Sequence, residues 1–533
     1  MLYLVVKMAL KLILLLPILG LVTTTSSLNI LGIFPYSGKS HFFVFSKYLE
    51  ELASRGHNVT VISHFPERQP IANYKTISLA GTTKIVEYDI PAVKNYFTKI
   101  AVGFYLGNSG IEDCEVMLAN KNVQHLVANK QKFDVIIVEQ FNSDCGLGIA
   151  HKLGAPVVGI TSHVLMPFHH ARFGVPDHPA FVSYHFLEGG TKPSLYQRVE
   201  RTLFDVYIKT LYSYYTQRTN QRTLAKYFDG IPPLEQLARD IKVVLVYYNF
   251  VLTGSKLHPA NMIEVGGYHV GKAKPLTGPL KDFIDGADAG VVYISFGSVI
   301  KSSTLPEHKL KAILRVMQEL PYRFVWKWED DTLKFDKNKL YLAKWLPQAD
   351  ILAHPKTKAF FSHGGMLGTT EGIHFGVPIV AMALFGDQPS NAAAIEESGL
   401  GVSLELEDLT KENLLKAFKT VLEPGFRENV KKLSAAWHDR PMSPMDTAIY
   451  WTEYVAKHPN ITYKNPSSEV PLYQYLMIDV YLILTAIVVT FILFIKLTCS
   501  LFKIVLHLST IAKRSITPKK VLSRGCQKKK QKS

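Results

Sequence analysis

The chain has 533 residues, 47% of them hydrophobic, so it is long enough to bury two cores, and two domains are expected. The formal net charge of +16 does not indicate a nucleic-acid partner, because eleven basic residues and no acidic ones lie after Ile495. The remaining charge of +5, the difference between those two numbers, is ordinary. Basic residues interleaved with aromatic ones, as nucleic-acid binding requires, are not found either.

The first 27 residues have the pattern of a cleavable signal peptide. Lys7 precedes an apolar run at residues 8–22, and small polar residues follow at 23–27. An uncleaved anchor is the alternative, and either one places the bulk of the chain in the secretory lumen. Asn58 and Asn460 are therefore candidate glycosylation acceptors, and Asn460 is preferred because Asn58 opens a predicted strand.

Short apolar runs alternate with helical segments along the mature chain. Strands are expected at residues 28–34, 59–63, 133–138 and 156–160, with a helix at 40–55. The pattern restarts after Val265, with strands that begin at residues 291, 323, 359 and 378. This alternation predicts an α/β fold of two doubly wound, Rossmann-like domains, at residues 28–255 and 256–465, that face each other across a cleft. Their connection is expected within residues 252–279, which are rich in Gly and Pro.

Residues 345–388 present side chains in the order in which a nucleotide sugar would need them. Trp345 offers a flat ring, and His363 and Gly365 follow a short apolar strand where a helix begins. Glycine lets the backbone and the helix N-terminus approach a phosphate. Glu371 lies on the same helix, where its carboxylate can accept hydrogen bonds from a diol. Ligands of open α/β sheets collect at the carboxyl ends of the strands, so these segments are expected to meet in one crevice.

Each of these residues also has an ordinary structural explanation. Trp345 alone would be a packing aromatic, His363 a hydrogen-bonded turn residue, and Asp387 an N-cap. It is their shared order and spacing that indicates a ligand site.

This order of residues resembles the donor-binding signature of the UDP-glycosyltransferases. Nearly the whole chain is similar to the membrane-bound animal branch of that family, of insect type, and Ser295 to Ser298 after the strand at 291 agree with it. The resemblance implies a GT-B fold and a UDP-sugar donor. It also implies a set of donor-binding residues: Trp345 and Gln348 for uracil, Ser298, His363 and Gly365 for the diphosphate, Glu371 for the ribose, and Asp387 and Gln388 for the sugar. Leu367 departs from the vertebrate pattern, which often has asparagine there, so that phosphate contact would come from Thr369, Thr370 or the backbone.

His41 is the candidate general base. It lies where the turn after the first strand enters a helix, and the helix N-terminus disfavours imidazolium, which keeps the ring neutral. By itself His41 would more often be a capping or buried histidine, but the resemblance places the family's catalytic base here. Relatives put an aspartate at the end of the strand that matches 133–138, where this chain has Glu139. Asp144 is the alternative partner for His41, or a plain N-cap.

The resulting hypothesis is a single inverting displacement. His41 takes the proton of an acceptor hydroxyl that attacks the anomeric carbon of an α-linked UDP-sugar, most simply UDP-glucose, and a β-glycoside and UDP result. Neither a metal nor another cofactor is expected, and the implied acceptors are small and lipophilic. The candidate lining residues of the acceptor pocket are Phe104, Phe168, Phe173, Phe181 and Tyr184, and the alternative for each of them is a place in the hydrophobic core. The alternatives are a glucuronosyl- or galactosyltransferase of the same fold, or a membrane-anchored binder of nucleotide sugars or lipophiles that has lost turnover.

A single membrane span is predicted at residues 472–495, and the basic tail at 496–533 places the C-terminus in the cytosol. The final Lys-Gln-Lys-Ser misses the register of a dilysine signal, so residence in the endoplasmic reticulum is implied by the resemblance. Cys114 and Cys145 could form a disulfide there, although the sequence does not show that they are close. No Cys/His spacing indicates zinc, and a homo-oligomer remains open.

Overall fold

The computed structural model describes residues 27–90, 96–176, 178–254, 257–461 and 465–516. The predicted signal peptide and the end of the predicted tail, residues 517–533, therefore lie outside the described residues. In the first half of the chain a seven-stranded parallel sheet has the order β3-β2-β1-β5-β6-β7-β8. Its strands are β1 (Asn29–Phe34), β2 (Asn58–Ser63), β3 (Tyr74–Ser78), β5 (Val135–Glu139), β6 (Val157–Ile160), β7 (Val243–Val246) and β8 (Met262–Glu264).

The central strands of this sheet, β1, β5, β6 and β7, are mostly apolar because helices cover both faces. In β5 all five residues are buried, and only its last residue, Glu139, is polar. A carboxylate at the end of such a strand lies at the edge of the sheet, where ligands of parallel sheets bind. The helices of this half are α2 (Lys39–Ser54), α3 (Tyr96–Ala119), α4 (Lys121–Ala128), α5 (Cys145–Leu153), α6 (His170–Phe173), α7 (Leu195–Thr210), α8 (Arg218–Tyr227), α9 (Leu234–Arg239) and α10 (Phe250–Thr253).

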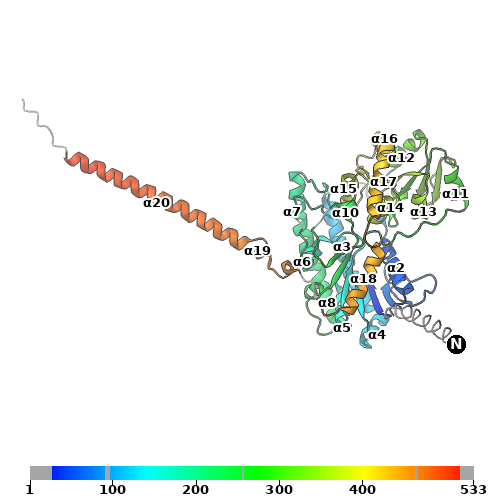
Figure 1. Ribbon diagram of the computed structural model, residues 1–533, viewed down its shortest axis with the longest axis horizontal. Helices are drawn as coiled ribbons and strands as arrows, with labels where there is room; N and C mark the ends of the chain where they lie inside the picture. The colour runs from blue at the N-terminus through cyan, green and yellow to red at the C-terminus, as the bar shows by residue number, and fades with distance from the viewer. Residues whose placement is uncertain (1–26, 91–95, 177, 255–256, 462–464, 517–533) are drawn as a thin grey trace, which may run out of the picture. The chain divides into compact units, whose positions relative to one another are not determined.

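A second parallel sheet, of six strands, has the order β12-β11-β9-β13-β14-β15. Its strands are β9 (Val291–Ser295), β11 (Arg323–Lys327), β12 (Leu340–Ala343), β13 (Thr357–Ser362), β14 (Ile379–Ala381) and β15 (Gly401–Ser403). The helices in this half are α11 (Gly278–Asp285), α12 (Glu307–Glu319), α13 (Gln348–Ala353), α14 (Met366–His374), α15 (Gln388–Ser398), α16 (Lys411–Leu422) and α17 (Pro424–His438). The prediction of two parallel α/β domains is therefore confirmed (Figure 1).

The two sheets lie within one compact unit that ends at Ser468. β4 (Tyr88–Asp89) of the first half pairs in parallel with β10 (Ile300–Lys301) of the second half. The chain then returns to the first domain, because α18 (Pro444–Lys457) packs on α2 and on β5, β6 and β7. Figure 1 shows α18, in orange, among the blue and cyan elements of that domain.

The first sheet extends past the predicted domain boundary at residues 255 and 256, because β8 pairs with β7 and ends at Glu264. At the other end, α18 lies within the range predicted for the second domain but packs on the first sheet. A three-residue strand carries too little periodicity to be recognised in the sequence, and only tertiary contacts assign α18.

The second unit of the chain begins at Glu469 and contains an apolar helix that is long enough to cross a membrane. The predicted span at 472–495 does not match the bounds of the helices. A short α19 (Leu472–Tyr475) is separated from α20 (Ile478–Ile516) by Met477, whose φ is 56°. α20 also continues past Lys496 to Ile516, because the residues that follow are mostly apolar and contain neither Gly nor Pro to break the helix. Its 39 residues exceed the roughly 20 that a bilayer core requires.

Candidate active site

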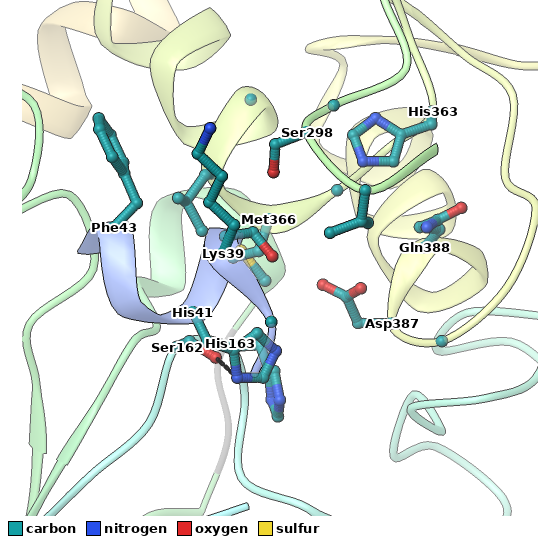
Figure 2. Close-up of a pocket in the computed structure, with 18 of the residues that line it drawn as sticks. Lys39, His41, Phe43, Ser162, His163, Ser298, His363, Met366, Asp387 and Gln388 are labelled. Atoms are coloured by element: carbon teal, nitrogen blue, oxygen red, sulfur yellow. Dashed lines mark hydrogen bonds between the residues drawn. The ribbon is translucent and has the colours of Figure 1, made fainter. Parts of the chain in front are cut away.

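A cavity of about 430 Å³ lies between the two sheets and is lined from both. The first domain contributes residues after β1, β5 and β6, and the second contributes residues after β9, β12, β13 and β14. Carboxyl ends of parallel strands thus face one another, as expected for ligand sites of this sheet type. The volume is within the range of small-molecule sites. Figure 2 shows His41 and His163 on one wall and Asp387, Gln388 and His363 on the other.

His41 and Glu139 are in contact at the first-domain wall of this cavity. His41 is the third residue of α2, and its Nδ1 lies 2.7 Å from Oε1 of Glu139 at the end of β5. Oγ of Ser162, which follows β6, lies 3.0 Å from the same nitrogen. When Nδ1–H donates to the carboxylate, Nε2 carries a lone pair that can take a proton. The geometry therefore suits a general base with an orienting carboxylate.

Burial sets the charge of both partners. It lowers the pKa of His41 to about 4, although Asp387 across the cavity partly opposes this effect. Burial also raises the pKa of Glu139 to about 8, and His163 partly opposes it. At neutral pH the imidazole is therefore uncharged, which is the form that a base requires.

Asp144, the alternative partner, is not brought to His41. Its two carboxylate oxygens accept from Nη1 and Nη2 of Arg172 at 2.8 and 2.9 Å, and both side chains are almost fully buried. Although burial favours the neutral acid, the charge and hydrogen bonds of Arg172 lower the pKa of Asp144 to about 2. Asp144 lies before α5 as predicted, but its side chain makes no cap hydrogen bond. The structure thus pairs Asp144 with Arg172 in a buried ion pair and leaves Glu139 as the carboxylate in contact with His41.

We expect Asp144→Ala to destabilise the protein by about 3 kcal/mol, since it leaves the Arg172 charge buried without its bidentate partner. The carboxylate contributes stability above its unfolded pKa, and this contribution is lost as the pH falls from about 4 towards 2. Chemical denaturation at pH 7 measures the difference. Glu235→Gln is the matched control, because Glu235 also contacts Arg172 but is more exposed, and it should cost less than about 1 kcal/mol. Unchanged stability in Asp144→Ala would contradict the structural role.

On the donor side, His363 follows β13 and is closely surrounded by glycine. A Cβ on Gly297 would come within 2.8 Å of the His363 ring, and a Cβ on Gly365 would collide with it as well. Gly297 also has φ of +84°, which L side chains rarely adopt. Gly365 is the N-cap of α14, so the free N–H groups of the first helical turn open beside His363. Burial, together with the charge of Lys327, lowers the pKa of His363 to about 4, so the ring can donate one hydrogen bond as a neutral group.

Trp345, Gln348 and Glu371 lie together at the same wall. Nε2 of Gln348 donates to Oε2 of Glu371, and Oη of Tyr293 donates to Oε1 of Gln348 at 3.2 Å. Nε2 of His269 lies 3.5 Å from the other oxygen of Glu371. Trp345 is 57% exposed, an unusual position for an indole that has no ligand to cover.

Asp387 and Gln388 are held firmly at the start of α15. Oε1 of Gln388 accepts from the backbone N–H groups of Leu384 and Phe385 at 2.8 and 3.1 Å. Nδ2 of Asn391 donates to Asp387 at 2.7 Å and to the carbonyl oxygen of Gly364 at 2.9 Å. Asp387 is therefore fixed opposite His41, where both a sugar and an acceptor would have to lie.

The structure also places two lysines at the cavity that the sequence analysis missed, Lys39 and Lys327. Lys39 opens α2, and Lys327 ends β11, where its Nζ contacts Glu329 at 2.8 Å. Like His41 and His363, both lysines lie at or just after the carboxyl end of a parallel strand, where ligands of such sheets bind. Ser298 lines the cavity as expected, and Leu367 lines it from the first turn of α14.

The predicted aromatic lining of the acceptor pocket is wrong. Phe173 and Tyr184 are buried in hydrophobic cores, Phe168 stacks on Tyr212, and Phe104 and Phe181 are exposed. None of these five lines the cavity. The apolar wall near His41 is instead formed by Tyr36, Phe43, Val86, Tyr88, Tyr105, Phe141, Met166 and Phe186.

Two doubly wound domains with a shared cavity define the GT-B glycosyltransferase fold, and solved structures agree. A UDP-glucose: anthocyanidin 3-O-glucosyltransferase in complex with UDP matches with a TM-score of 0.53 and 17% identity, over 81% of this chain and all of that one. A UDP-glucosyltransferase from Polygonum tinctorium matches with a TM-score of 0.55 and 16% identity, over 81% and 100%. At this identity the likeness concerns the fold alone.

The family model described as "UDP-glucoronosyl and UDP-glucosyl transferase" matches residues 31–514, and the chain belongs to this family of enzymes. UDP-glucosyltransferase 2 of Dactylopius coccus is 34% identical over 91% of this chain and 95% of its own length. UDP-glucuronosyltransferase 1A9 of Mus musculus is 29% identical over 86% and 89%. The predicted family, insect relatives included, is thereby confirmed.

Proposed function

We propose that this enzyme transfers glucose from UDP-glucose to a hydroxyl of a small lipophilic acceptor, with inversion at the anomeric carbon. One observation carries the proposal: the His41–Glu139 pair faces Asp387 across a cavity whose other wall presents the residues that we propose to bind the donor. His41 Nε2 takes the acceptor proton as the oxygen attacks from the face opposite the diphosphate. One base and one displacement give a β-glycoside from an α-linked donor.

The donor is proposed to lie along the second sheet. Uracil stacks on Trp345, the ribose hydroxyls donate to Glu371, and the diphosphate lies at the first turn of α14 beside His363 and Ser298. These groups stabilise the charge that develops on the leaving UDP, so the proposal requires no metal. Leu367 has no side-chain donor, and the backbone N–H groups of that turn replace the asparagine that vertebrate relatives often have.

Glucose is favoured over glucuronate by the fixed carboxylate of Asp387. A glucuronate carboxylate held in this part of the cavity would be repelled by it, whereas glucose hydroxyls can donate to it. The glucosyltransferase name of the Dactylopius coccus relative supports the same choice. The apolar wall that includes Phe141 and Phe186 favours acceptors with an aromatic or aliphatic body.

The test is a product analysis with purified membranes, simple phenols and three donors: UDP-glucose, UDP-glucuronate and UDP-galactose. We expect UDP-glucose to give at least about tenfold higher kcat/KM than either competitor, a difference of about 1.4 kcal/mol. Proton NMR of the product should show only the β-anomer. An α-glycoside would exclude the inverting mechanism, and a preference for UDP-glucuronate would replace glucose as the donor. UDP binding without turnover on any acceptor would favour a non-catalytic binder.

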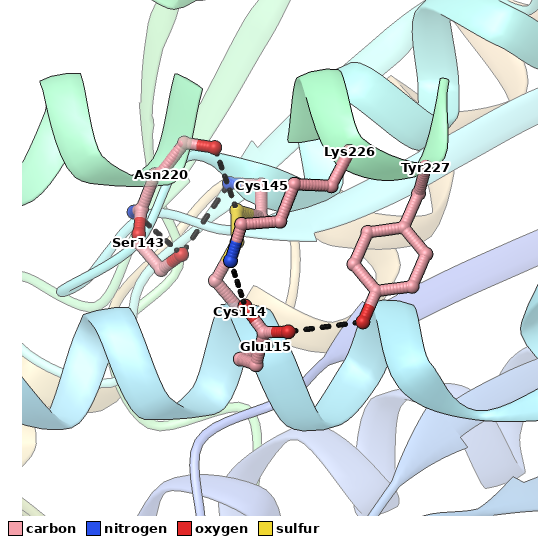
Figure 3. The surroundings of a disulfide bond; sticks show 7 residues. All are labelled: Cys114, Glu115, Ser143, Cys145, Asn220, Lys226 and Tyr227. Atoms are coloured by element: carbon pink, nitrogen blue, oxygen red, sulfur yellow. Dashed lines mark hydrogen bonds and ion pairs between the residues drawn. A yellow bond between two sulfur atoms is a disulfide. The ribbon is translucent and has the colours of Figure 1, made fainter. Parts of the chain in front are cut away.

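The catalytic part is proposed to lie in the lumen of the endoplasmic reticulum, with α20 as the membrane anchor. Cys114 of α3 and Cys145 of α5 form a disulfide, with Cα atoms 5.6 Å apart (Figure 3). Disulfides persist in oxidising compartments, which supports a lumenal site for this domain. The basic residues after Ile495 support a cytosolic C-terminus.

A further inference from the structure

Lys39 and Trp345 meet across the cavity, although they belong to different domains. Nζ of Lys39, at the start of α2, lies 4.4 Å from the centroid of the Trp345 indole, which follows β12. Both residues line the cavity, so the indole face that the lysine covers is a face that opens into it. An ammonium group from the first domain thus occupies the place where the proposed function puts uracil.

The charge of Lys39 is not neutralised by an acidic neighbour. Among the residues that the structure describes, Lys39 forms no ion pair with a carboxylate within 4.0 Å. Lys327, by contrast, is held by Glu329. Figure 2 shows the Lys39 side chain extending from the start of α2 toward the wall that carries Ser298. A long, unpaired cation beside a proposed diphosphate site can contact phosphate once it leaves the indole.

We propose that Lys39 changes its contact partner when the donor binds, and we call this exchange of contacts the latch. Without nucleotide its ammonium lies on Trp345 as a cation–π contact between the two domains. When uracil takes the indole face, the ammonium is displaced and contacts the diphosphate, which replaces a weak contact by a charge-assisted one. The proposal rests on the proposed function, because it requires a uridine diphosphate at this wall.

The latch has opposite consequences for the binding of a nucleoside and of its diphosphate. Uridine must displace Lys39 and gains no phosphate contact in return. UDP loses the same cation–π contact but gains a stronger one. Lys39 should therefore weaken the binding of uridine and strengthen the binding of UDP, so that the first domain helps the site to select a phosphorylated ligand.

The experiment measures UDP binding by titration calorimetry and uridine binding by saturation-transfer NMR, on full-length wild type and Lys39→Met. We expect the Kd for UDP to rise about tenfold and the Kd for uridine to fall about threefold, the scales of a charge-assisted contact and of an exposed cation–π contact. Methionine keeps the unbranched chain and helix propensity, so that only the charge is removed.

Two variants complete the test. Lys39→Arg keeps a cation that can do both tasks, and both Kd values should stay within about twofold of wild type. Lys47→Met, on the same helix and paired with Glu50, should leave both values unchanged. Shifts of the same sign for UDP and uridine, or a change in only one of them, would overturn the latch. If wild type itself does not bind UDP, it is the proposed function that fails.

Discussion

Replacing His41 by alanine should lower kcat about a hundredfold to ten-thousandfold, the usual contribution of general acid–base catalysis, and leave UDP binding within about twofold. The imidazole is neutral and contacts Glu139 through Nδ1, so that when Glu139 is ionised and accepts from Nδ1–H, Nε2 can take a proton. The residues that we propose to bind the donor lie on the opposite wall, so the substitution should not disturb them. Initial rates of UDP release with UDP-glucose and a phenol, beside UDP titrations, measure the two quantities.

His163 is the matched control for this prediction. Its ring centroid lies 5.4 Å from that of His41, and it also lines the cavity. Its Nδ1 is held by the carbonyl oxygen of Val164 at 2.6 Å rather than by a carboxylate, so it lacks the partner that would stabilise an imidazolium. We expect His163→Ala to cost less than about tenfold in kcat. If His163→Ala abolishes turnover and His41→Ala does not, the base has been assigned to the wrong histidine.

The sheets and the donor wall could be predicted from the sequence because local patterns define them. Buried parallel strands read as apolar runs, and the residue at the carboxyl end of each run lies at the ligand edge whatever packs behind it. This reasoning placed His41, His363 and Asp387 at one cavity, and it placed Glu139 in contact with His41. The same rule, applied to Lys327 at the end of β11, would have found it too.

The sequence did not predict several features that depend on which surfaces pack together. Phe168 and Phe186 both lie beside histidines in the segment between β6 and β7, yet only Phe186 lines the cavity, whereas Phe168 stacks on Tyr212. The sequence leaves Asp144 and Glu139 as alternative partners of His41. Only the structure shows that Asp144 pairs with Arg172, which lies 28 residues further along the chain. The packing of α18 on the first sheet is hidden in the sequence for the same reason, since the strands it contacts lie roughly two hundred to three hundred residues earlier in the chain.

The second large expected effect is a rise of kcat/KM with pH through about 8, set by Glu139. Burial keeps this carboxyl protonated up to that pH, while the pKa of His41 is about 4. A protonated Glu139 donates to Nδ1 of His41, which places the ring proton on Nε2 and removes the lone pair that faces the cavity. Only the ionised carboxylate accepts from Nδ1–H and makes the ring a base. The rate should therefore increase about tenfold per pH unit below the midpoint and reach a plateau above it.

Two substitutions separate this ionisation from other causes. Glu139→Gln should lower kcat by up to about ten-thousandfold, as loss of the orienting carboxylate does in catalytic triads, and should remove the rise with pH. Glu139→Asp keeps a carboxylate and should keep the rise.

Over the same pH range, the free energy of unfolding should fall as the rate rises. The folded pKa of Glu139 lies above its unfolded value of about 4.5, so its contribution to stability is complete below that pH and is lost as the pH rises towards about 8. Glu139→Gln should therefore gain stability relative to wild type at pH 9 but not at pH 4, as measured by chemical denaturation. The wild-type enzyme would then be most active where Glu139 destabilises it most, because the fold holds a buried charge that only catalysis requires. A wild-type rate that does not change between pH 6 and 9 would show that Glu139 is already ionised at neutral pH and would contradict this mechanism.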